Sequence, residues 1–191
     1  MGYIKQLISY LGLHIYVVQP LSRVWWYMGI GLAAWTCLAI FCYHIGREKL
    51  WRRCNGWIAA AYGMLLLYMT VASRSETAHG GVMLRPLYSF YLAQTENREY
   101  YRTMLMNVFL FFPLGLTLPF GLAGGKRPIL RTVGIGMALS VSVEILQYIF
   151  SLGWTETDDV IMNVLGAFLG SASFGIACLI KRRKPYPDQC V

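Results

Sequence analysis

The stretch SVSVEILQYIFSLGWTETDDVIMNVLGAFLG, residues 140–170, places polar side chains inside an otherwise apolar part of the chain. Long apolar runs lie on both sides of it, without the strict alternation that a half-buried strand would show. Its middle carries a glutamate, a glutamine, three further acids and an asparagine. The apolar runs decide the class of fold, and the polar residues raise the question of function.

The composition is that of an integral membrane protein. Of the 191 residues, 57% are hydrophobic and 14% are charged, and the mean hydropathy is +0.47. Soluble domains carry about 25% charged residues. In lipid every backbone polar group must be satisfied internally, which leaves helical bundles or closed barrels. The length of the apolar runs favours helices.

Five apolar segments are suited to crossing a bilayer, which takes about 20 residues in helical form. They cover residues 24–44, 57–72, 104–123, 129–150 and 160–180. Residues 4–18 are short for a span, so they form either an interfacial amphipathic helix or a sixth membrane helix. The sequence therefore predicts an all-α, polytopic membrane helical bundle of five transmembrane helices plus this N-terminal segment.

The predicted organisation is an N-terminal amphipathic segment (1–23), a transmembrane bundle (24–180) and a basic tail (181–191). Eleven lysines and arginines flank the spans on one side of the membrane and six on the other. The more basic side is expected to be cytoplasmic, which places the C-terminus inside the cell. The net charge of +8 is thus attributed to membrane topology, and no nucleic-acid partner is predicted.

Four polar residues of the last two spans are spaced to share helix faces. Glu144 and Gln147 are three apart, and Asp159 and Asn163 are four apart. The turn between the two spans is short, so the helices are expected to be antiparallel neighbours. These side chains are therefore predicted to meet in the outer half of the bundle.

The third predicted span adds Asn107 near its outer end, followed by Pro113. A proline inside a helix removes a backbone hydrogen bond, and the freed carbonyl needs a partner or lines a cavity. Gly166 and Gly170 continue the face of Asn163 at helical spacing, and small residues let membrane helices approach closely.

Each of these residues has both a structural and a functional interpretation. Amide side chains join membrane helices, and Asp158 and Asp159 have the position of caps for the last helix. An intramembrane acid such as Glu144, however, is a functional candidate by default. The carboxylate and amide oxygens of these residues are of the type that binds a hard cation, but their spacing alone does not indicate a cation site. We predict no metal site and no cofactor.

The order and spacing of these residues resemble the VanZ family, over about residues 80–175. Three helical motifs carry the resemblance: NVFLFFPLGLTLP, VEILQYIF and TETDDVIMNVLGAFLG. The matching positions are Asn107, Pro113, Gly115, Glu144, Gln147, Asp159, Asn163 and Gly166. Family members often carry an arginine in the turn before the aspartate, and SLGWTETDD has none.

The resemblance implies a multi-pass protein of a Gram-positive bacterial plasma membrane, linked to resistance to the glycopeptide antibiotic teicoplanin. One hypothesis is a non-enzymatic factor whose outer polar site, with Arg85 nearby, binds a lipid-linked peptidoglycan precursor or teicoplanin itself. A second is a membrane-embedded enzyme in which Glu144 is the general acid or base and Asp159 its partner. A third is a small transporter or an assembly scaffold.

Overall fold

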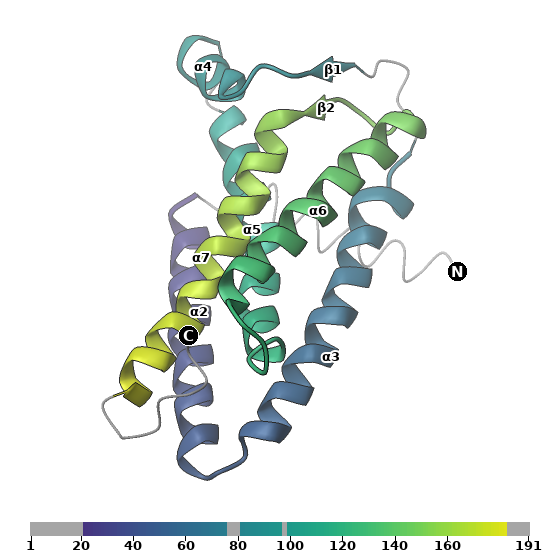
Figure 1. Cartoon of the computed structure of the whole chain (residues 1–191). Coiled ribbons are helices and arrows are strands. Elements are labelled where there is room, and N and C mark those ends of the chain that lie inside the picture. Colours follow the sequence, from purple (N-terminus) through teal and green to yellow (C-terminus); the bar gives the residue numbers. More distant parts are fainter. Residues whose placement is uncertain (1–20, 76–80, 97–98, 183–191) are drawn as a thin grey trace.

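The computed structural model describes residues 21–75, 81–96 and 99–182. The predicted helix of residues 4–18 lies outside the described residues, and so do residues 183–191 of the predicted basic tail. Within this part of the chain the secondary structure is almost entirely helical (Figure 1).

The helices follow one another with short connections. In chain order the elements are α2 (Leu21–His44), α3 (Glu48–Leu67), a π-helical turn η2 (Tyr68–Ala72), β1 (Val82–Met83), α4 (Tyr88–Thr95), α5 (Glu99–Gly121), α6 (Pro128–Ile149), β2 (Thr155–Glu156) and α7 (Thr157–Arg182). Among the described residues, five helices are long and apolar enough to cross a membrane, namely α2, α3 with η2, α5, α6 and α7. The predicted all-α bundle with five spans is confirmed.

The basic stretch of residues 48–56 is helical, so the predicted second span of residues 57–72 begins too late. It forms the first turns of α3, which begins at Glu48. Trp51 and Asn55, four residues apart, give this polar stretch an inward face. The Trp51 ring lies 5.6 Å from that of Trp35 and 5.8 Å from that of Phe120. Asn55 donates to the Trp51 carbonyl (2.8 Å) and accepts from the Trp35 indole N–H (2.9 Å).

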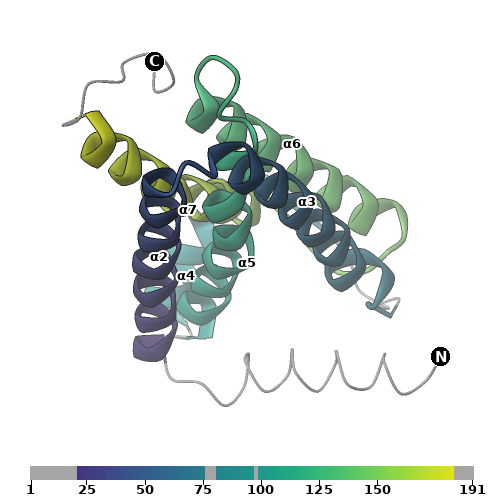
Figure 2. The same ribbon diagram turned by 90° about the horizontal axis from the view of Figure 1, so that it is seen from below.

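Helix α5 is the centre of the bundle. It contacts α2, α3, α4, α6 and α7, and Figure 2 shows it between α2 and α3. Of its most apolar stretch 67% is buried inside the protein, against 22% for α2. The outer faces of the other helices remain apolar and exposed, as a lipid solvent requires.

The two prolines of α5 do not interrupt it. The helix runs from Glu99 to Gly121 with Pro113 and Pro119 inside. Hydroxyl groups bind carbonyls around Pro113: Tyr62 donates to the Leu110 oxygen (2.7 Å) and Thr117 to the Pro113 oxygen (3.0 Å). Neither oxygen is the one that Pro113 deprives of its helical donor, which is the Phe109 carbonyl four residues back, so the two hydroxyls add hydrogen bonds beside it.

Helices α5 and α7 touch through their backbones. A Cβ atom added at Gly115 would collide with the Ala167 carbonyl oxygen, and one at Gly166 with the Val108 carbonyl oxygen. A Cβ atom added at Gly170 would likewise collide with the Phe112 carbonyl oxygen. Only glycine allows this distance, so the three glycines fix how α7 lies along α5.

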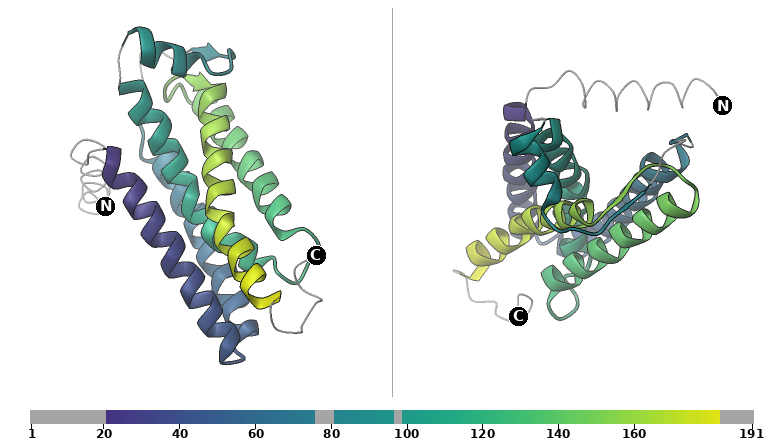
Figure 3. Two further views of the ribbon diagram at one scale, coloured as in Figure 1. Left: turned by 90° about the vertical axis from the view of Figure 1, so that its left-hand side faces the viewer. Right: turned by 90° about the horizontal axis from the view of Figure 1, so that it is seen from above.

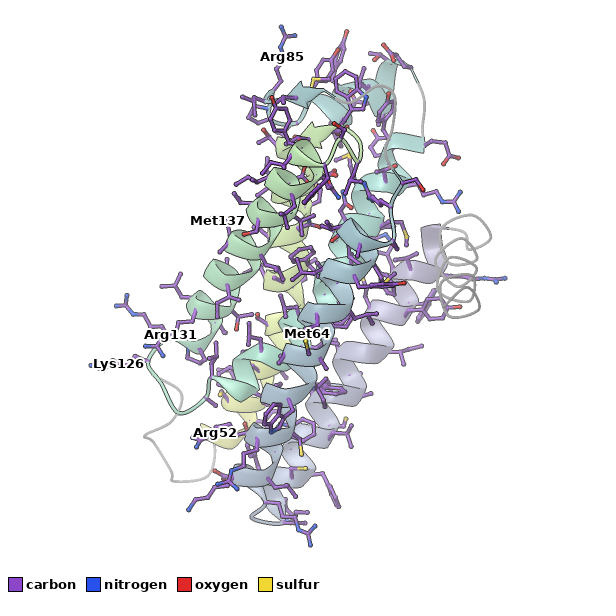
Figure 4. The ribbon with its side chains drawn as sticks, turned by 90° about the vertical axis from the view of Figure 1, so that its right-hand side faces the viewer. Arg52, Met64, Arg85, Lys126, Arg131 and Met137 are labelled. Atoms are coloured by element: carbon purple, nitrogen blue, oxygen red, sulfur yellow. The ribbon has the colours of Figure 1, made fainter. Side chains whose placement is uncertain are left out.

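One end of the bundle is closed by a short parallel sheet and by α4. Val82 pairs with Thr155 and Met83 with Glu156, and α4 crosses above α5 and α7 (Figure 3). We call this the carboxylate end, because Glu144, Glu156, Asp158 and Asp159 all lie there. The opposite end, formed by the α2–α3 and α5–α6 turns, carries Arg52, Lys126 and Arg131 (Figure 4), and we call it the basic end.

Enlarging a glycine of the α5–α7 contact should destabilise the bundle. We expect Gly166→Ala to cost about 1–3 kcal/mol, because the added methyl forces the two backbones apart. Gly134→Ala is the control, since nothing lies within 4 Å of its added Cβ on α6. It should be neutral or stabilising by about 0.5–1 kcal/mol. Thermal unfolding in detergent measures both, and equal melting temperatures would contradict the close contact.

The orientation deduced from charge remains a prediction and can be checked by labelling. In a chain with its five cysteines replaced by serine, Glu96→Cys and Lys126→Cys mark opposite ends at exposed positions. In intact cells a membrane-impermeant maleimide should label Glu96→Cys and should reach Lys126→Cys only after lysis. The reverse pattern would invert the topology.

Candidate functional site

The carboxylate of Glu144 joins α6 to the small sheet. Its side chain is only 5% exposed, and Oε2 accepts the backbone N–H of Glu156 at 3.0 Å. The Thr155 hydroxyl donates to the Glu144 carbonyl oxygen at 3.3 Å. Glu144 therefore holds β2 over the end of α6.

Asp159, in the first turn of α7, pairs with Asn107 of α5. The Asn107 side-chain amide donates to Asp159 Oδ1 at 2.6 Å, a charge-assisted length. Two residues predicted to be functional, 52 positions apart in the sequence, are therefore in direct contact. Among the described residues no hydrogen-bond donor engages Asp159 Oδ2 or Glu144 Oε1.

The side-chain amides of Asn163 and Gln147, the two other predicted site residues, donate to different partners. Asn163 donates to the Ser140 hydroxyl at 2.9 Å, and its Oδ1 atom is buried without a hydrogen-bond partner in the described structure. Gln147 donates at 3.0 Å to the carbonyl of Thr70 in the π-helical turn η2. Gln147 thus connects α6 to η2, whereas Asn163 keeps an unsatisfied acceptor beside α6.

Asp158 caps a helix other than its own. Its two carboxylate oxygens accept the backbone N–H groups of Leu87 and Ser89, at the start of α4. Leu87 adopts a left-handed conformation (φ 60°), which is costly for a branched residue and needs support. Asp158 is 2% exposed, so this carboxylate is committed to holding α4 in place. Glu156 adds a bond at 3.0 Å from the Ser89 hydroxyl.

Arg74 is the cation of this end that the sequence did not single out. It follows η2 and attracts both Glu144 and Asp159 electrostatically. An added Cβ at Gly153 would lie 3.8 Å from its Nη1 atom, so its guanidinium borders the α6–β2 turn. An arginine that follows η2 thereby supplies positive charge to the turn SLGWTETDD, which has none of its own.

Arg85, predicted to lie near the polar site, lies away from it. It projects from the tip of the carboxylate end, away from the bundle (Figure 4), with its guanidinium carbon 5.9 Å from the centre of the Tyr88 ring. The structure therefore brings together Asn107, Asp159 and Glu144, with Gln147 and Asn163 close by on α6 and α7, and leaves Arg85 outside this group. No group of three or more His, Cys, Asp or Glu in the described part of the chain could hold a metal ion.

Comparison with known proteins gives the family. The VanZ/LLP1 family model matches residues 58–180, which is more than half of the chain. The chain belongs to the VanZ/LLP1 family. Within it, the sequence is similar to Protein VanZ of Enterococcus faecium, with 36% identity over 77 residues.

That similarity covers 40% of this chain and 47% of the relative, so the chain spans about half the length of the curated protein it matches. No solved structure matches the chain at a significant level. The family membership confirms the resemblance seen in the three helical motifs. Together with the five spans, it makes the chain a multi-pass membrane protein of this family.

Removing the charge of Asp158 should loosen α4 without unfolding the bundle. In Asp158→Asn the two backbone donors lose a charged acceptor, which costs about 1–3 kcal/mol. Hydrogen exchange of the Leu87–Leu92 amides should speed up accordingly, while α5 stays protected. Glu96→Gln is the control, because Glu96 is an exposed acid just after α4. Unchanged exchange in Asp158→Asn would show that this carboxylate does not hold α4.

Proposed function

We propose that this protein supports resistance to teicoplanin in a Gram-positive plasma membrane. In this proposal the carboxylate end binds a lipid-linked peptidoglycan precursor or the lipid-bearing drug. The observation that carries it is the Asn107–Asp159 contact beside Glu144, with one free oxygen on each carboxylate among the described residues. Membership of the VanZ/LLP1 family supports the link to resistance.

The chemistry of the site suits such ligands. Peptidoglycan precursors and glycopeptides are rich in amide and hydroxyl donors, which pair with the oxygens of Glu144, Asp159 and Asn163. Hydrogen bonds to charged groups contribute about 1.5–3 kcal/mol each. Arg74, at the edge of the site, would pair with a carboxylate or phosphate of the same ligand.

The neighbouring surface is suited to a lipid chain. Ile145, Ile149, Phe150 and Trp154 are all more than half exposed beside the carboxylate end. Each buried methylene contributes about 0.8 kcal/mol, so an acyl chain lying along this surface would add strongly to binding. Teicoplanin carries such a chain and vancomycin does not, which gives a physical basis for acting on one drug alone.

An enzymatic role for the same residues is the second candidate. The buried carboxylate of Glu144 and the partly buried one of Asp159 lie at the same end of the bundle and are candidates for a general acid and base. In this alternative Glu144 and Asp159 would transfer protons while a wall precursor or lipid is modified. Mass spectrometry of lipids and precursors separates the two candidates, because binding alone leaves their profiles unchanged on expression.

The decisive experiment is drug susceptibility in a sensitive Gram-positive host. Wild type is expected to raise tolerance to teicoplanin and not to vancomycin. Glu144→Gln and Asp159→Asn should lose this tolerance, since one charged hydrogen bond accounts for about tenfold or more in affinity. Glu96→Gln, at the same end but exposed, serves as the matched control.

Membrane abundance must be equal in all strains, because both carboxylates also hold the fold together. Full tolerance in both variants would show that the two carboxylates have only a structural role and would contradict the proposed site. If wild type itself changes neither tolerance, the link to teicoplanin fails. Titration of nanodisc-embedded protein with teicoplanin then reports binding independently of the host.

A further inference from the structure

The basic end contains a pocket that the proposed function does not use. Its volume is about 140 Å³, and it lies between the start of α3, the end of α2 and the end of α5. Trp51, Lys49 and Arg52 of α3 line it, together with Tyr43 and Phe120. It combines two cations with an aromatic wall, at the end of three membrane-spanning helices.

The indole of Trp51 presents an unused hydrogen-bond donor. Its Nε1 atom is buried and has no partner in the described structure. The nearby acceptor Asn55 Oδ1 is already taken by the indole of Trp35. Contacts with the rings of Trp35 and Phe120 hold the Trp51 ring in place, so the donor does not turn away. A buried N–H without an acceptor is unfavourable, and an acceptor bound in the pocket would satisfy it.

Arg52 reaches across the pocket to the α5–α6 turn. Its Nη1 atom occupies the space that a side chain at Gly124 would fill. Arg131 approaches Gly125 in the same way, and Lys126 projects from the same turn (Figure 4). One acid, Glu48, also lines the pocket and interacts electrostatically with Tyr43. The charge around the pocket is therefore net positive.

Exposed apolar side chains occur at the same helix ends that form the pocket. Phe41 and Ile45 at the end of α2, and Leu50 in α3, are each about half exposed or more. Apolar neighbours add nothing to the binding of a free anion, whereas a phospholipid places its phosphate beside acyl chains that can contact them. Basic pockets between transmembrane helices are known sites for anionic headgroups.

We propose that this pocket binds the phosphate group of an anionic phospholipid. The Trp51 indole N–H, Arg52 and Lys49 are its donors, and the exposed apolar residues of the same helix ends contact the acyl chains. The site is independent of the carboxylate end and of any role in resistance. It would fix the depth and tilt of α3 in the bilayer.

Native mass spectrometry of the full chain in detergent tests this proposal. The probes are phosphatidylglycerol, phosphatidylcholine and inorganic phosphate, added separately. Phosphatidylglycerol should be retained best. Arg52→Gln should weaken its binding about five- to tenfold, the size expected for one basic contact with an anionic headgroup. Arg53→Gln is the matched control, because Arg53 is the next residue of α3, is exposed and does not line the pocket.

Two further variants keep the test valid if Arg52→Gln folds poorly. Trp51→Phe removes the N–H and keeps an aromatic ring, and Gly124→Val displaces the Arg52 guanidinium without changing the charge. Both should lose phosphatidylglycerol and retain the thermal stability of wild type in lipid-free detergent. Equal lipid retention in Arg52→Gln, Trp51→Phe and Arg53→Gln would overturn the proposal. Retention of inorganic phosphate but not of phosphatidylglycerol would overturn the assignment to a lipid.

Discussion

The backbone contact between α5 and α7 is the constraint on which the rest of the structure depends. Gly166 of α7 lies against the carbonyl of Val108, the residue that follows Asn107. Two turns earlier on α7 is Asp159, which this contact brings within 2.6 Å of the Asn107 amide. With larger side chains in place of the glycines, the helices would separate and the hydrogen bond would be lost. Close packing in the interior of the bundle therefore sets the geometry of its polar end.

The four acids of the carboxylate end have different hydrogen-bond partners and therefore different structural roles. Asp158 and Glu144 each accept backbone N–H groups, which fixes α4 and β2 over the bundle. Asp159 pairs with a neutral amide, and Glu156 with a hydroxyl. Backbone amides and neutral side chains stabilise a carboxylate without cancelling its charge. Arg74 and Arg85 add positive charge at this end, and the acceptor oxygens of the acids suit ligands that donate hydrogen bonds.

The two ends of the bundle have opposite chemistry. The basic end has exposed lysines and arginines around an aromatic pocket, and the other has buried acids under a small sheet. Between them the helices expose apolar side chains to lipid. This separation of charge is of the kind that sets the orientation of membrane proteins, in which basic residues favour the cytoplasmic side. It also allows two ligands of different charge to bind one chain without competing.

The sequence by itself determined the five spans and the face-sharing of Glu144 with Gln147 and of Asp159 with Asn163, because apolar length and helical periodicity are local properties. It also indicated that Asn107 belongs to the same region. Only the tertiary structure decided that Asp158 caps α4 rather than its own helix, that Arg74 borders the turn after α6 and that Arg85 projects away. It likewise extended the second span back to Glu48. These outcomes depend on contacts between segments up to about seventy residues apart, where side-chain reach and backbone donors count and sequence spacing carries no information.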